Sequence, residues 1–174
     1  AAVVSSITVR RLFGYSFATW RFHLRGESIR SATDIGWMRE LTVRRMMRKD
    51  ARTVPAKTDI VRLKRDFPLG ATQRLIVVDD ENRYVGIILV PELHRETAEE
   101  VTAGQLVQLA DVALLPNLSV KEAMKAFAAA EADALAVIDG TGERKVIGLL
   151  TEQHALRRYT EELDRRQNEA NPYT

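Results

Sequence analysis

The side chains best placed to do chemistry are Thr151 and His154, which follow the apolar run 146–150. A hydroxyl and an imidazole three residues apart lie on one face of a helix, where each can form a hydrogen bond to a polar ligand. The Thr hydroxyl also suits the N-cap of that helix, with Glu152 favourable at the positive helix end and His154 a surface residue. Both interpretations remain open from the sequence.

Other reactive groupings find little support. The chain has no Cys, which excludes disulfides and thiolate metal sites and fits a reducing compartment. His23, His94 and His154 lack the spacing of metal ligands. No phosphate-binding Gly-rich loop, nucleophile elbow or zinc-protease motif occurs, and the acidic run 79–81 falls in an expected hairpin turn, where Asp is favoured for backbone reasons. We therefore expect neither an enzyme nor a resident metal.

The elements that position Thr151 have an earlier copy in the chain. The runs 134–140 and 145–151 match 74–80 and 83–89: an apolar run ends in an acidic residue, a polar turn follows, and a second apolar run carries one Gly. This pattern predicts a β-hairpin with buried strands. A repeat spacing of about sixty residues indicates two units that must pack together, because one unit cannot bury both faces of its sheet alone.

Each copy opens in the same way, with a short apolar strand ending at Pro, a hydroxyl residue and a helix, over 54–67 and 115–127. Thr58 and Ser119 stand where helix N-caps belong. A further helix follows each hairpin, the later one over 152–167. The predicted fold class is α+β: two β-α-β-β-α units packed through their sheets, after an N-terminal helical segment.

These patterns divide the chain into four parts. A helical segment occupies 1–41, the first unit 42–96 and the second unit 105–166, and the tail 167–174 is expected to fray. The polar, acidic stretch between the two units is a linker.

Positive charge is concentrated at the N-terminus. The net charge of the chain is +2, whereas residues 1–50 carry ten Arg or Lys against four Asp or Glu. Tyr15, Phe17, Trp20 and Phe22 interleave with arginines there, a composition suited to a membrane interface or to an amphipathic helix packed on protein. Nucleic acid is the rival partner for such a patch. No run reaches the roughly 18 apolar residues of a membrane span, so we expect a soluble fragment.

The two units resemble a tandem pair of cystathionine β-synthase (CBS) domains, over residues 42–166. The second copy is the closer match, because it keeps Thr151 from the family pattern of Gly, two apolar residues, Thr or Ser, two more residues, then Asp. It has His154 where the Asp is expected. The first copy has Leu89 and Glu92 at these two positions, so only a carboxylate remains there.

The resemblance implies a regulatory ligand and no required cofactor. CBS pairs commonly bind adenine nucleotides between their units, so ATP, ADP or AMP is the expected ligand, with Thr151 and His154 on its ribose or phosphate. The expected walls of the adenine slot are Val112, Ala113, Leu114 and Leu115. Since Leu89 cannot hydrogen-bond a ribose, at most one competent site is expected per pair. A pair without any ligand is the alternative.

The N-terminal segment narrows the resemblance. Residues 13–26 are similar to the end of the last membrane helix of bacterial ClC chloride channels and transporters, which leads into a cytoplasmic CBS pair. The chain would then be the regulatory tail of a voltage-gated-type chloride channel or chloride/proton exchanger, on the cytoplasmic face of the inner membrane. Its partner would be the membrane domain of the same polypeptide, and chloride the transported ion. Tyr15 would lie near the inner end of the anion pathway.

A homodimer is expected, because the resembled family is dimeric and because each unit is expected to leave apolar helix faces uncovered. These faces contain Val61, Leu63, Met124, Phe127, Leu156 and Tyr159. Regulation would work by population shift, with a ligand that prefers one packing of the units. Two alternatives stay open: a purely structural dimerisation tail, and a stand-alone nucleic-acid-binding protein. The regulatory reading has no nucleic-acid partner.

Overall fold

The structure, a computed structural model, describes residues 41–170, with side chains described as far as residue 165. The predicted N-terminal segment, including Tyr15 and residues 13–26, lies outside the described residues, as does the end of the tail. Within residues 41–170, no helix is long and apolar enough to cross a membrane.

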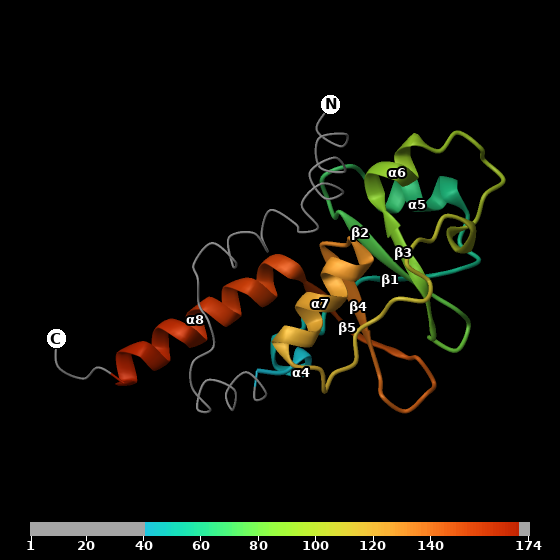
Figure 1. The fold of residues 1–174 in the computed structure, drawn as a ribbon. Helices are drawn as coiled ribbons and strands as arrows, with labels where there is room; N and C mark the ends of the chain where they lie inside the picture. The colour runs from blue at the N-terminus through green and yellow to red at the C-terminus, as the bar shows by residue number, and fades with distance from the viewer. Residues whose placement is uncertain (1–40, 171–174) are drawn as a thin grey trace.

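The first unit has the predicted order of elements (Figure 1). They are β1 (Thr53–Pro55), α5 (Ile60–Asp66), β2 (Arg74–Val78), β3 (Tyr84–Leu89) and α6 (Val90–Arg95). The central strand β2 pairs in parallel with β1 and antiparallel with β3. Its apolar residues are buried along almost the whole strand, as expected for a strand that is covered on both faces.

The second unit repeats this order with a reduced first strand. Its elements are α7 (Val120–Ala130), β4 (Ala134–Ile138), β5 (Val146–Thr151) and α8 (Glu152–Ala170). The strand predicted at 115–116 is represented by one parallel bridge, between Leu114 and Val137. Pro116 has no N–H to donate, which ends the pairing early. Both hairpins carry an irregularity at the same place, one of them between Val137 and Ile138.

The helices α5 and α7 are capped by side chains, although one cap is not the predicted residue. Ser119 and Glu122 form a capping box, in which the Glu122 carboxylate accepts from the Ser119 N–H at 2.8 Å. In the first unit the Asp59 carboxylate accepts from the Arg62 N–H at 2.8 Å, so the prediction of Thr58 as N-cap is wrong. Asp59 directly precedes the helix, and a charged acceptor binds the first-turn amides more strongly than a hydroxyl.

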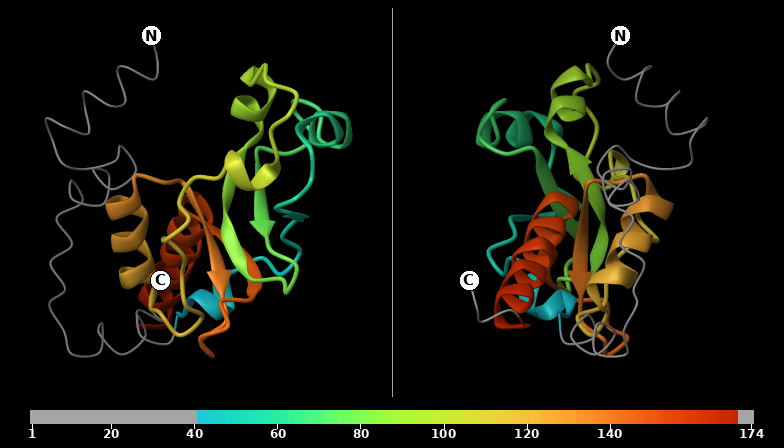
Figure 2. Two further views of the ribbon diagram at one scale, coloured as in Figure 1. Left: turned by 90° about the vertical axis from the view of Figure 1, so that its right-hand side faces the viewer. Right: turned by 60° about the vertical axis from the view of Figure 1, so that its left-hand side comes forward.

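The two units pack together through the faces of their sheets, which confirms the predicted architecture. The cluster between them contains Ile76, Tyr84 and Ile87 of the first unit and Ala136 of the second. Each unit also has a core of its own beneath its helices. Figure 2 shows the sheets side by side, with α7 and α8 flanking the second unit and α5 on the opposite side of the molecule.

A short segment before β1 packs on the second unit instead. This segment, residues 41–48, contains the helix α4 (Val43–Met46), and we call it the N-terminal strap. Leu41, Val43 and Met46 are buried in the core of the second unit. Thr42, just before α4, pairs with Ser119 at the start of α7, and α4 contacts α8, so α4 lies beside the second unit (Figure 1).

The linker makes the complementary crossing. Residues 102–108, which we call the linker strap, precede the bridge at Leu114 and the helix α7 of the second unit but pack on the first unit. They include the 3₁₀ turn η1 (Ala103–Gln105), and Ala103 is buried in the first core. The N–H groups of Ala103 and Gly104 each donate at 2.8 Å to carbonyls next to β1, at Thr58 and Ala56. The two units are therefore interlocked by crossed straps.

The helix faces predicted to stay uncovered are mostly covered within the chain. Leu63, Phe127 and Tyr159 belong to the cores of their own units, and Met124 is half-buried against the second core. Val61, by contrast, is 56% exposed. The prediction fails because α7 packs on α8, and α8 packs on β5 and α4, all within one chain. These faces give no argument for a homodimer.

Candidate functional site

Thr151 ends β5, and α8 begins at the next residue. Its hydroxyl accepts a hydrogen bond from the His154 N–H at 3.2 Å, so Thr151 caps α8. The Glu152 N–H donates to the Asp133 carbonyl at 2.9 Å, which fixes this junction against the start of β4. A hydroxyl that accepts still has a proton to donate. Helix capping and contact with a ligand are therefore compatible roles for Thr151.

His154 is half-buried on the first turn of α8. Its Nδ1 lies 3.0 Å from Nη2 of Arg157, and a ring nitrogen that accepts from a guanidinium carries no proton, which leaves Nε2–H as the donor. Burial lowers the pKa of His154, and the positive charges of Arg157, Arg158 and Arg48 lower it further against the opposing charge of Glu161. The imidazole is thus held neutral among cationic side chains.

Of the predicted wall residues 112–115, Leu114 pairs with β4. Leu114 is fully buried and exchanges backbone hydrogen bonds with β4, at 2.8 and 3.0 Å. Val112 precedes this bridge, and its N–H donates to the Leu109 carbonyl at 3.1 Å in a turn. Leu115 follows the bridge and is 37% exposed. The placement of these residues as walls of a nucleotide slot stays a prediction.

The equivalent junction in the first unit is built differently. Leu89 occupies the N-cap position of α6 and makes no side-chain hydrogen bond there. The carboxylate of Glu92 accepts a hydrogen bond from the side-chain amide of Gln108, in the linker strap. The polar group that survives in the first unit is therefore already engaged by the chain itself.

The N-terminal strap reaches β5 close to Thr151. Arg48 and Leu149 exchange two backbone hydrogen bonds, at 2.8 and 2.9 Å. A Cβ on Gly148 would lie 2.7 Å from the Arg48 carbonyl oxygen and 3.0 Å from Sδ of Met47. Glycine is required at position 148 because the strap approaches the strand too closely for any side chain.

The linker strap approaches β3 in the same way. Gln108 and Ile87 exchange backbone hydrogen bonds of 2.8 Å, and a Cβ on Gly86 would lie 2.7 Å from Cβ of Val107. The glycine in each second hairpin strand was visible in the sequence pattern. Its meaning was missed: it marks the place where a crossing segment pairs with the strand.

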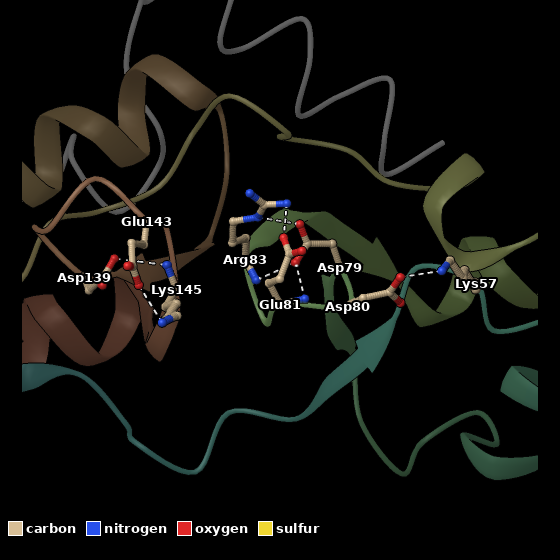
Figure 3. A network of polar contacts seen from close by, with 8 residues as sticks. All are labelled: Lys57, Asp79, Asp80, Glu81, Arg83, Asp139, Glu143 and Lys145. Atoms are coloured by element: carbon tan, nitrogen blue, oxygen red, sulfur yellow. Dashed lines mark hydrogen bonds and ion pairs between the residues drawn. The ribbon is translucent and has the colours of Figure 1, made fainter.

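The acidic residues of the hairpins stabilise their own turns (Figure 3). Oδ1 of Asp79 accepts from the N–H groups of Glu81 at 3.0 Å and Arg83 at 2.8 Å, and the Arg83 bond is the main cause that lowers the pKa of Asp79. Asp139 accepts from the Lys145 N–H at 3.0 Å. The two hairpins meet at an antiparallel β-bridge between the backbones of Arg83 and Lys145. Across the described part of the chain, no group of three or more His, Asp or Glu could hold a metal ion.

Comparison with known proteins connects this architecture to a family. The profile of the CBS domain matches residues 43–97 and 107–161. No curated protein matches the sequence.

Several solved structures share the fold. A Thermotoga maritima protein with a CBS domain pair and an ACT domain is 19% identical, with a TM-score of 0.56, over 70% of this chain and 98% of that one. The CBS domain of a bacterial CNNM/CorC family Mg²⁺ transporter, solved with ATP, is 16% identical, with a TM-score of 0.62, over 72% and 92%. CBSX2, solved with AMP, is 19% identical, with a TM-score of 0.58, over 69% and 96%.

The resemblance read from the hairpins and the Gly-x-x-Thr junction is thereby confirmed at the level of the domain pair. The two interlocked units are CBS domains, and the chain belongs to the CBS domain family.

Proposed function

We propose that this CBS pair is a non-enzymatic regulatory module that binds an adenine nucleotide at the Thr151 junction and acts on a membrane ion-transport domain. The observation that carries the proposal is the Thr151 hydroxyl, which caps α8 through the His154 N–H and keeps its own proton to donate. Two CBS structures with the same fold support the ligand class, one solved with ATP and one with AMP. The first of these belongs to an ion transporter.

The chemistry of the junction suits a ribose and an anionic phosphate. Thr151 would donate to a ribose oxygen, while the first-turn amides of α8 and its positive dipole end would attract phosphate. The Nε2–H of His154 and the guanidinium of Arg157 would add donors on the same face of the helix. In the first unit Leu89 and the engaged Glu92 offer no such set, so one site per pair is proposed.

The finer proposal names the transport domain as that of a bacterial ClC chloride channel or chloride/proton exchanger, on the cytoplasmic face of the inner membrane. It rests on the similarity of residues 13–26, in which Tyr15 would lie near the anion pathway. The coding sequence upstream of residue 1 tests it. A ClC membrane domain there would support the proposal, and the membrane domain of a Mg²⁺ transporter would contradict it.

The homodimer also belongs to this finer proposal. It rests on the dimeric nature of the resembled family alone. The apolar helix faces no longer support it, because they are covered within one chain. Sedimentation of the purified chain measures it directly. A monomer at all concentrations would contradict the dimer without touching the nucleotide site.

The nucleotide proposal is tested by isothermal titration calorimetry with ATP, ADP, AMP and S-adenosylmethionine. We expect saturable binding of one adenine nucleotide and its loss in Thr151→Val. Thr160→Val is the matched control, because Thr160 also lies on α8 but its hydroxyl donates to the Leu156 carbonyl at 3.1 Å, away from the junction. Circular dichroism would confirm that both variants fold. Absence of binding by the folded wild type would contradict the proposal and favour a purely structural tail.

A further inference from the structure

The N-terminal strap is anchored unequally along its length. Its beginning is held in the second unit by buried side chains and by backbone bonds: the Val43 N–H donates to the Leu118 carbonyl at 2.8 Å, and the Val120 N–H donates to the Leu41 carbonyl at 2.9 Å. Its last residue is held only by the backbone pairing of Arg48 with Leu149, which we call the Arg48 joint. Beyond this joint the chain runs into β1 of the first unit.

The linker strap ends in an equivalent pairing, Gln108 with Ile87, which we call the Gln108 joint. This joint has an additional clasp, because the Gln108 side chain donates to the carboxylate of Glu92 on the adjacent helix α6. The backbone bonds of the two joints are of similar length, from 2.8 to 2.9 Å. The side chains around the joints therefore determine how they differ.

The Arg48 joint has no such clasp. His154 takes the place that Glu92 has in the first unit, and it offers no negative charge to Arg48. The Arg48 guanidinium instead pairs at 2.8 Å with Asp50, in the same exposed stretch of chain. The charged groups that act on the pKa of His154 are Arg157, Arg158 and Glu161 of α8 and Arg48 of the strap, and cations outnumber anions among these four. This charge disfavours close approach of Arg48 to α8.

We propose that the Arg48 joint is the releasable contact between the two CBS domains, and that an anionic ligand at the Thr151 junction closes it. Phosphate placed beside His154 would supply the negative charge that Glu92 supplies to Gln108. The strap begins at Leu41, which is anchored in the second unit. Closing the joint therefore fixes the first unit relative to Leu41, where the strap begins. The ligand step rests on the proposed function, whereas the inequality of the two joints does not.

Hydrogen exchange of the ligand-free chain tests the inequality. One clasp hydrogen bond corresponds to about a threefold to tenfold difference in local opening. The amides of Arg48 and Leu149 should therefore exchange that much faster than those of Gln108 and Ile87. Equal or slower exchange at the Arg48 joint overturns the inference, whether or not a nucleotide binds.

Transferring the side-chain clasp to the Arg48 joint supplies a test that does not depend on weakening the fold. The double variant Arg48→Gln with His154→Glu recreates the Gln108 and Glu92 pair at the Arg48 joint, and should slow exchange there by about threefold to tenfold. Arg48→Gln alone is the matched control and should slow it much less. If the double variant and its control behave alike, side chains do not set the strength of the joint and the inference fails.

Hydrogen exchange with a bound nucleotide tests whether ligand binding at the Thr151 junction closes the Arg48 joint. A nucleotide that calorimetry shows to bind should slow exchange at Arg48 and Leu149 and leave Gln108 unchanged. Binding without any slowing overturns the coupling but leaves the proposed function intact. If the folded chain binds no nucleotide, the proposed function and the ligand step are both contradicted. The inequality of the two joints is then tested by hydrogen exchange of the ligand-free chain alone.

Discussion

Arg74, at the start of β2, forms an ion pair with Asp133, which lies just before β4. The side chain of Arg74 is 16% exposed and that of Asp133 is 66% exposed. The Asp133 carbonyl also accepts the Glu152 N–H, so this pair joins the first CBS domain to the strand end that supports the Thr151 junction.

Removing the charge of Asp133 should have a small effect on stability. In Asp133→Asn the exposed partner is lost while the Arg74 stem stays packed, so the free energy of unfolding should fall by about 0.5–1 kcal/mol. Urea denaturation at low and high salt measures this, and the effect should shrink in high salt. Asp66→Asn, which breaks an ion pair within α5, is the control and should show no change in the contact between domains. A loss of about 3 kcal/mol or more would mean that the pair behaves as a buried one.

The close approach at Gly148 predicts a large difference between two glycines of the same hairpin. Gly148→Ala would push its methyl group against the Arg48 carbonyl, and overpacking of this kind costs about 1–3 kcal/mol. Gly140→Ala meets nothing within 4 Å and should leave stability within about 1 kcal/mol of the wild type. Chemical denaturation of the two variants measures the difference. Equal stability would mean that the strap does not need the space beside β5.

The hairpins could be predicted from sequence because their strands are contiguous apolar runs, and local alternation with turn residues specifies both partners. The pairing of the straps could not be predicted in this way, because Arg48 and Leu149 lie far apart in the sequence and no local pattern indicates that they pair. Glycines at the equivalent positions 86 and 148 were the available signal. The prediction that the helix faces stay uncovered failed for a related reason. An apolar stripe shows that a helix face is covered, but not whether the covering residues belong to the same chain.

The buried position of Phe127 predicts a strong effect within a single chain. Phe127 is 1% exposed in the second core, so Phe127→Ala should lower the free energy of unfolding by about 3–5 kcal/mol through lost burial and the cavity left behind. Val61→Ala, at an exposed site of α5, should stay within about 0.5 kcal/mol of the wild type. Denaturation at several protein concentrations distinguishes burial within one chain, which gives the same loss at every concentration, from burial at a dimer interface. An effect of Phe127→Ala that appears only where a dimer forms would restore the helix face as an interface.

The caps of α5 and α7 predict which hydroxyl matters. Ser119→Ala removes a side chain that accepts from the Glu122 N–H, and should cost about 1 kcal/mol. Thr58→Ala should cost clearly less, because Asp59 already caps α5. Thermal or urea unfolding of both variants measures this. Similar losses from the two substitutions would mean that Thr58 shares the capping of α5.

The environment of His154 predicts a pH dependence of stability with a definite sign. Burial first, and then the charge of Arg157, lower the pKa of His154 below its ordinary value of 6.5. The unfolded chain therefore binds a proton at a higher pH than the folded chain does. As pH falls through the window between these two pKa values, the free energy of unfolding decreases, and the decrease levels off below the folded pKa.

His154→Gln should remove this part of the pH dependence, because an amide does not titrate. Urea denaturation of wild type and variant across the window below pH 6.5 measures it as a difference in slope, so titration of other groups cancels between the two proteins. Gln153→Ala, at the exposed neighbouring position, should keep the wild-type slope. Identical slopes for wild type and His154→Gln would mean that His154 titrates in the folded chain as it does in water. The cationic surroundings that oppose approach of Arg48 to α8 would then be too weak to influence the Arg48 joint.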